Sequence, residues 1–145
     1  MGNKNKTKDR RGYGQFMGIP HVVLEHSDYI DLSTKAKALF VEIAYQYNGH
    51  NNGDMTVAFK ILKKRGWKRN ATISAAVKEL LGANLIIKTR EGRFQHPFSR
   101  CALYALTWQS IDDFSDKGLE VSPTATAPRK FSLERCQKKH PLLKT

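Results

Sequence analysis

Cysteine is scarce in this chain of 145 residues. The two cysteines, Cys101 and Cys136, make neither a disulfide framework nor a set of zinc ligands. Apolar runs are also short, and none approaches the roughly 20 residues that a membrane-spanning helix needs. The N-terminus is polar and lacks the apolar segment of a signal peptide. These absences predict a cytoplasmic protein, associated with the nucleoid if it binds DNA.

Acidic residues are few: 13 Asp and Glu stand against 25 Lys and Arg, a formal net charge of +12. The excess is concentrated in one part of the chain. Residues 60–100 hold eleven Lys and Arg against two acids, a net +9, whereas residues 12–59 hold two Lys against five acids, a net −3. Such clustering favours a polyanionic partner. Nucleic acid is favoured over an acidic membrane because no basic segment has a strong apolar face of its own.

Three amphipathic helices are predicted from periodicity. The first spans residues 34–47 and is capped by Ser33, with one apolar face made of Ala36, Leu39, Phe40, Ile43, Ala44 and Tyr47. The second spans residues 56–65 from an N-cap at Thr56, and it is expected to bury Val57, Ala58, Ile61 and Leu62. The third is capped by Asn70 and ends near residue 83, burying Ile73, Val77, Leu80 and Leu81.

The turns between these helices carry their own signals. Gly66 is suited to the left-handed position that ends a helix, and Trp67 is expected to fill the corner beside it. Asn84 stands at a second left-handed position, after the third helix. Residues 85–90 and 101–108 are predicted as two strands joined by a basic and aromatic tip. Val22–Leu24 is predicted as a strand or an extended segment.

Three regions follow from this pattern. Residues 1–18 are predicted as a disordered basic arm, 19–113 as the folded domain, and 114–145 as a flexible basic tail. The tail has three prolines between residues 114 and 145 that follow no helical pattern. The tail is a candidate segment for recruiting replication or transcription machinery. The sequence leaves open whether the protein forms a homodimer.

The chain from Leu32 to Trp108 resembles the winged helix-turn-helix superfamily, in particular small domains of bacterial and phage replication-initiation and regulatory proteins. The resemblance is carried by Leu32-Ser33, residues 36–40, the loop 51–53, the turn Gly66-Trp67, residues 72–74, Glu79-Leu80, Leu85-Ile86 and residues 103–108. It implies an α+β fold: a three-helix bundle with a helix-turn-helix, followed by a two-stranded hairpin wing. In such motifs the second helix of the helix-turn-helix enters the major groove.

Candidate DNA contacts follow from the residue types at these places. Free N–H groups and Lys or Arg at a helix N-terminus bind phosphate, whereas amide, hydroxyl and methyl groups reach base edges. The helix-turn-helix supplies Lys63, Lys64, Lys68, Arg69, Asn70, Thr72, Ser74, Ala75 and Lys78, and the wing supplies Arg90, Arg93 and Arg100. Phe94 and Phe98 are expected to serve the wing tip, to pack under the hairpin or to form a dimer contact.

These features predict a sequence-specific protein that binds double-stranded DNA, as a transcriptional regulator or a replication-initiation factor. The alternative is a winged-helix adaptor that binds protein or RNA without DNA specificity. An enzyme is not expected, because no nucleophile with a base, paired carboxylates or phosphate-binding glycine loop is evident. No cofactor is expected either. His21, Glu25 and His26 match no zinc motif, so no metal is expected.

Overall fold

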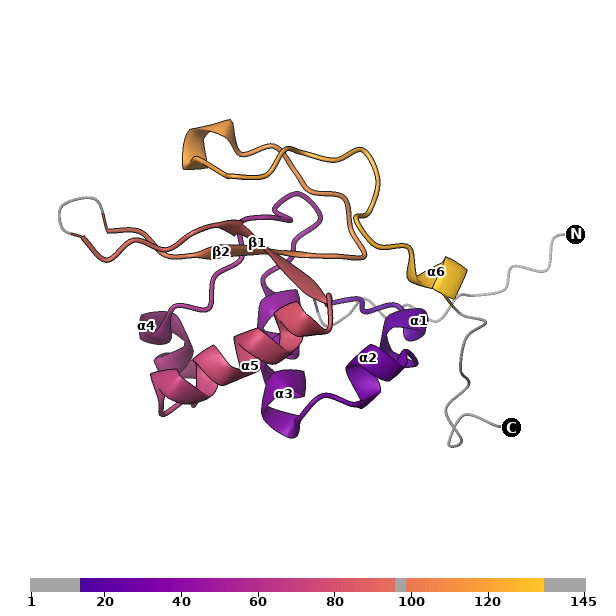
Figure 1. Ribbon diagram of the computed structural model, residues 1–145, viewed down its shortest axis with the longest axis horizontal. Helices are drawn as coiled ribbons and strands as arrows, with labels where there is room; N and C mark the ends of the chain where they lie inside the picture. The colour runs from indigo at the N-terminus through magenta and orange to yellow at the C-terminus, as the bar shows by residue number, and fades with distance from the viewer. Residues whose placement is uncertain (1–13, 96–98, 135–145) are drawn as a thin grey trace, which may run out of the picture.

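The computed structural model describes residues 14–95 and 99–134, which form a mixed α+β fold with a two-stranded antiparallel sheet (Figure 1). In chain order its elements are α1 (His21–Leu24), α2 (Ser27–Ile30), α3 (Thr34–Tyr45), α4 (Phe59–Leu62), a 3-10 helix (Lys63–Arg65), α5 (Asn70–Gly82), β1 (Ile86–Arg90), β2 (Leu103–Leu106), a 3-10 helix (Ser115–Lys117) and α6 (Phe131–Glu134). Helices α3 and α5 lie on one side of the sheet (Figure 1). The chain after β2 lies on the other side.

Helix α3 begins where the sequence predicts. The Ser33 hydroxyl accepts a hydrogen bond from the backbone N–H of Ala36 at 3.2 Å, which satisfies one of the free donors of the first turn. The same hydroxyl donates to Glu79 Oε2 at 2.6 Å, and the Ser33 N–H donates to Glu79 Oε1 at 3.0 Å. These bonds lower the pKa of the Glu79 carboxyl. A single cap therefore starts α3 and ties it to α5.

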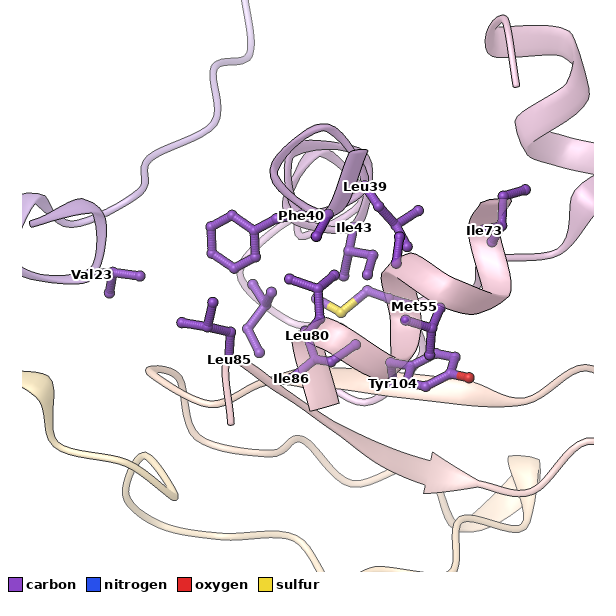
Figure 2. Close-up of a cluster of buried hydrophobic side chains, with 14 of the residues drawn as sticks. Val23, Leu39, Phe40, Ile43, Met55, Ile73, Leu80, Leu85, Ile86 and Tyr104 are labelled. Carbon is purple, nitrogen blue, oxygen red and sulfur yellow. The ribbon is translucent and has the colours of Figure 1, made fainter. Parts of the chain in front are cut away.

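The core lies between these helices and the sheet (Figure 2). Helix α3 contributes the buried face predicted from its periodicity, except that Tyr47 is only partly buried and lies beyond the end of the helix. Helix α5 contributes Ile73, Val77 and Leu80 as predicted, together with Ala76. The fully buried cluster also includes Val23, Met55, Leu85 and Ile86. Apolar burial of this kind is the dominant favourable term in folding.

The sheet pairs Ile86 with Leu106 and Lys88 with Tyr104, and its register shifts between Lys88 and Arg90. The two predicted strands are thus present, the second shorter than predicted. Met55 pairs with Tyr104 on the other edge of β2: the Tyr104 N–H donates to the Met55 carbonyl at 2.8 Å. The loop before α4 therefore extends the sheet by one bridge.

Asn52 holds that loop against the end of β2. It is fully buried, and its side-chain oxygen accepts a hydrogen bond from the Leu106 N–H at 2.7 Å. Its amide nitrogen lies within hydrogen-bonding distance of the carbonyl oxygens of Leu106, Gln109 and Ser110, at 3.0, 3.1 and 3.0 Å. A buried amide with all of its groups satisfied fixes a loop in one position, because any other position leaves polar groups unpaired.

Two elements differ from the secondary structure predicted from the sequence. Val22–Leu24, predicted as extended, lies in helix α1, where the Pro20 carbonyl accepts bonds from the Val23 and Leu24 N–H groups at 3.1 and 3.4 Å. The predicted helix 56–65 begins only at Phe59. Its first residue, Thr56, is held by Gln46, which bonds both its N–H (2.9 Å) and its carbonyl (2.8 Å). The shorter helix buries Leu62 but leaves Ile61 47 % exposed, and Val57 and Ala58, also predicted as buried, lie before it and are only partly buried.

The described part of the predicted flexible tail is packed on the domain. We call residues 119–134 the strap. Its backbone donates hydrogen bonds from Glu120 to the Thr89 carbonyl at 2.7 Å and from Arg129 to the Thr107 carbonyl at 2.9 Å. The Phe131 side chain, only 3 % exposed, joins the core. This corrects the expectation of a flexible linker for residues 119–134, whereas residues 135–145 lie outside the described part of the chain.

Arg129 fastens the strap. Its guanidinium donates to Glu134 at 2.9 and 3.0 Å, to Asp28 at 2.6 Å, and to the carbonyls of Ala83 and Asn84 at 2.8 and 3.2 Å. The side chain is only 9 % exposed. One residue thus joins the strap, helix α2 and the turn after α5, because five donors in a rigid fork can serve several acceptors at once.

An aromatic contact completes this junction. The Arg129 guanidinium lies 4.1 Å from the centroid of the Phe131 ring, and the His26 ring meets the same ring edge-on at 5.4 Å. Cation–π and edge-to-face contacts add to the burial of the ring. The chain before α3 and the strap after β2 are therefore joined at one place.

Replacement of Arg129 by alanine is expected to destabilise the fold by about 3 kcal/mol. That is the low end of the cost of breaking a buried ion pair, because both carboxylates are partly exposed. Urea denaturation of the Arg129→Ala variant measures the loss. Lys130→Ala is the matched control, since Lys130 is exposed and has no ion pair among the described residues. Equal stability of the two variants would contradict the role given to Arg129.

Acidic pH should weaken the attachment of the strap to the domain. Hydrogen bonding from Arg129 lowers the pKa of the Glu134 carboxyl from its ordinary value of 4.5. A carboxyl whose pKa is lowered on folding stabilises the fold above its unfolded-state pKa, and this stabilisation is lost as the pH falls through the folded-state pKa. The Glu134→Gln variant should therefore be less stable than the wild type at pH 7, and the difference should shrink below about pH 4.5. A difference in unfolding free energy that stays constant from pH 7 to about pH 3 would be inconsistent with this linkage.

Candidate nucleic-acid interface

The turn between the short 3-10 helix and α5 is set by Gly66, which has the left-handed backbone conformation predicted for it, with φ of +95°. The following N–H group, of Trp67, donates to the Leu62 carbonyl at 3.1 Å. The Trp67 side chain is partly buried and packs against the core, as predicted. Because this ring anchors the turn, the residues on either side of it are held outward on a fixed loop.

Helix α5 begins one residue earlier than predicted. Arg69 occupies the N-cap position in an extended conformation, and Asn70 is the first helical residue rather than the cap. The Arg69 side chain makes no capping hydrogen bond to the first turn of α5. The Asn70 side chain is exposed and is not needed by the helix terminus. Donors at such a terminus favour an anionic group, because the helix dipole adds to their own polarity.

The outer face of α5 consists of small and polar side chains. Ser74, Ala75 and Lys78 are exposed and Thr72 is partly buried, as predicted. These positions follow from the helical period, because burial of Ile73, Ala76 and Val77 turns Ser74, Ala75 and Lys78 outward. Apart from Lys78 these side chains are short, which permits another surface to approach the helix closely.

Basic side chains lie in the 3-10 helix and in the turn that precede α5. Lys63, Lys64, Lys68 and Arg69 are all exposed, and within residues 14–95 and 99–134 none forms a hydrogen bond or ion pair through its side chain. Arg65, in the same run, differs: it is paired with the Glu42 carboxylate and lies 4.5 Å from the centroid of the Tyr45 ring. The hydrogen bond with Glu42 raises the pKa of Arg65 further above its ordinary value. The cations that remain available to a partner are therefore Lys63, Lys64, Lys68 and Arg69.

Of the three hairpin arginines predicted to contact DNA, two are bonded within the protein and one is exposed. Arg90 donates to the Cys101 carbonyl at 2.7 and 3.1 Å and to the Lys117 carbonyl at 3.0 Å. Arg100 is paired with Glu120 at 2.8 Å. Both side chains, predicted to contact DNA, thus hold the hairpin to the segment that follows it. Arg93 is exposed, and its backbone pairs with that of Arg100.

Of the two aromatic residues predicted at the tip of the hairpin, the structure describes only one. Phe94 is 96 % exposed, so it does not pack under the hairpin. Phe98 lies outside the described residues. An aromatic side chain that is fully exposed beside Arg93 adds an apolar group to the end of the hairpin, available to a partner surface.

These features share one end of the molecule. In Figure 1, α4 and the outer part of the hairpin lie at the left, and α1 and α6 lie at the opposite end. Asp28 of α2, and Glu25 and Asp31, which directly follow α1 and α2, therefore lie away from α4. These acidic residues are separated in space from the basic turn, which favours approach of a charged partner at one end, whereas Glu42 of the same stretch pairs with Arg65 beside the turn.

The described residues contain no group of three or more His, Cys, Asp or Glu side chains placed to hold a metal ion. Of His21, Glu25 and His26, only His26 takes part in a cluster, and its partners are Asp28, Arg129 and Glu134. In the same part of the chain no helix has the length and apolar character that crossing a membrane requires.

Measurements of unfolding free energy can distinguish a hairpin arginine that supports the fold from one that is exposed to a partner. Arg90→Ala is expected to lower the unfolding free energy by about 1.5 kcal/mol, because three hydrogen bonds from a charged group to carbonyls are lost. Arg93→Ala is the matched control and should change stability by less than about 0.5 kcal/mol, as exposed substitutions do. Thermal melting of both variants measures this. A melt of Arg90→Ala identical to that of Arg93→Ala would refute the structural role of Arg90.

Comparisons of the chain with protein-family models, with curated proteins and with solved structures find no significant match. Its function is therefore inferred from its own residues.

Proposed function

We propose that this protein is a winged helix that binds double-stranded DNA, with α5 in the major groove and the β1–β2 hairpin as its wing. The observation that carries the proposal is the outer face of α5 (Thr72, Ser74, Ala75 and Lys78), together with exposed cations before the helix whose side chains have no partner within the described residues. A helix in the major groove needs both: room to approach the bases and charge to hold the backbone.

The groove chemistry assigns a role to each group. A helix of 13 residues is about 20 Å long and fits the major groove of B-DNA end-on or along its floor. Asn70 at the start of α5 can pair with adenine through its amide, and Ala75 offers a methyl contact to thymine. Thr72, Ser74 and Lys78 complete the proposed set of contacts to base edges.

Five other exposed cations of the helix-turn-helix and the hairpin are assigned to phosphates. Lys63 and Lys64 follow α4, Lys68 and Arg69 lie in the turn, and Arg93 lies in the wing. Each neutralised phosphate releases counterions, so binding should weaken steeply as salt rises. Arg90 and Arg100 are left out of this set, because they are engaged within the protein. A sequence-specific complex of this kind suits a transcriptional regulator or a replication-initiation factor.

Charge reversal in the turn tests this assignment. The double variant Lys68→Glu, Arg69→Glu should lose DNA affinity on the order of 100-fold, about tenfold for each contact. Its melting temperature should stay near that of the wild type, since both side chains are exposed. Fluorescence anisotropy with duplex DNA at two salt concentrations measures the affinity. The control Lys37→Glu, Lys130→Glu changes the net charge equally but lies outside the proposed face.

Two outcomes would overturn the proposal. One is unchanged affinity in the Lys68, Arg69 double variant, since binding would then use another surface. The other is equal or tighter binding to a duplex RNA of the same sequence, because the deep, narrow major groove of A-form RNA excludes a helix. Binding of neither nucleic acid would favour a protein partner instead.

A further inference from the structure

A groove lies beside the turn, between it and helix α3. It encloses about 580 Å³ and is lined from one side by Lys35, Ala38 and Glu42 of α3. The other side is lined by residues 65–69 and by Thr72 of α5. Lys35 lies 30 residues before the nearest of these residues on the other side, so only the fold brings it to the basic turn.

The charges that line the groove are unbalanced. It has four cationic side chains and a single carboxylate, that of Glu42. Arg65 is paired with that carboxylate, so this pair neutralises itself. Lys35, Lys68 and Arg69 remain exposed, and their side chains have no hydrogen bond or ion pair within the described part of the chain. Three cations facing one hollow without a counter-charge suit an anion with several acceptor oxygens.

The uncharged residues that line the groove restrict the kind of ligand that fits it. Trp67 contributes an aromatic surface and Thr72 a hydroxyl. Gly66 contributes no side chain, and nothing lies within 4 Å of where its Cβ would be, so the backbone there is accessible. An apolar surface beside cations fits a sugar next to a phosphate better than a free inorganic anion, which has no apolar part.

We propose that this groove holds the sugar–phosphate backbone of one DNA strand, and that Lys35 of α3 is a phosphate contact outside the helix-turn-helix. This rests on the proposed DNA-binding function and adds to it a second, independently placed element. Phosphate contacts fix the orientation of a protein on the duplex without selecting its sequence. A contact from α3 sets the angle at which α5 meets the major groove.

The chain offers a matched pair of variants. Lys35→Ala removes the groove cation, whereas Lys37→Ala removes a lysine of the same helix that lies 5.5 Å from the centroid of the Tyr29 ring and does not line the groove. Lys35→Ala should weaken binding about three- to tenfold, equally for a selected and a random duplex, and should reduce the slope of log affinity against log salt by about 0.9. Lys37→Ala should bind as the wild type does, and Lys35→Arg should retain binding.

The outcomes separate this inference from the proposed function. If the Lys68, Arg69 reversal abolishes binding while Lys35→Ala keeps both the wild-type affinity and salt slope, the groove assignment is wrong and the DNA-binding function stands. If the wild type does not bind duplex DNA, both are wrong. Titration with inorganic phosphate, followed by the amide signals of Lys35 and Thr72, tests the other source of the anion. Saturable shifts in a protein that ignores duplex DNA would assign the groove to free phosphate and overturn the proposal.

Discussion

The packing of α3 and α5 against a two-stranded sheet is the constraint on which the other elements depend. An isolated two-stranded hairpin is marginally stable in water and needs a covering layer to persist. Here the apolar faces of two helices cover one side, and the strap crosses the other (Figure 1). The same burial decides the outer surface of α5, because a helix that turns Ile73 and Val77 inward must turn Ser74 and Ala75 outward. The proposed interface is thus a consequence of the core.

Local signals in the sequence predicted several elements that local physics determines, although not helix α1, whose bonds to the Pro20 carbonyl are also local. The Ser33 cap, the buried face of α3 and the left-handed Gly66 and Asn84 depend on residues within one or two helical turns. Where distant residues intervene, the predictions failed. Helix α4 starts late because Gln46, ten positions before Thr56, bonds to its backbone. The strap has no periodicity to detect, since single anchors such as Arg129 and Phe131 hold it.

Prediction of the candidate site from the sequence fails for the same reason, because contacts between distant residues decide which cations are free. The number of cations between residues 60 and 100 is evident from the sequence, and most of them are exposed as expected. Which cations are free is not evident, because the partners of Arg65, Arg90 and Arg100 lie 23, 11 and 20 residues away. Lys35 stands in a stretch of net negative charge and gives no sign of its place beside the turn. Only tertiary structure separates cations that hold the fold together from cations that face outward.

The buried amide of Asn52 also bears on the chemical lifetime of the protein. Asn followed by Gly is the pair most prone to deamidation, since the Gly N–H meets little steric hindrance in attacking the side-chain carbonyl. Asn52-Gly53 is such a pair, and so is Asn48-Gly49 in the same loop. Folding immobilises Asn52, whereas Asn48 is exposed. If the chain unfolds for long enough to convert Asn52 to Asp, a carboxylate must face three carbonyl oxygens on refolding. Conversion of Asn52 to Asp in the unfolded state is therefore expected to destabilise the closed form of this loop.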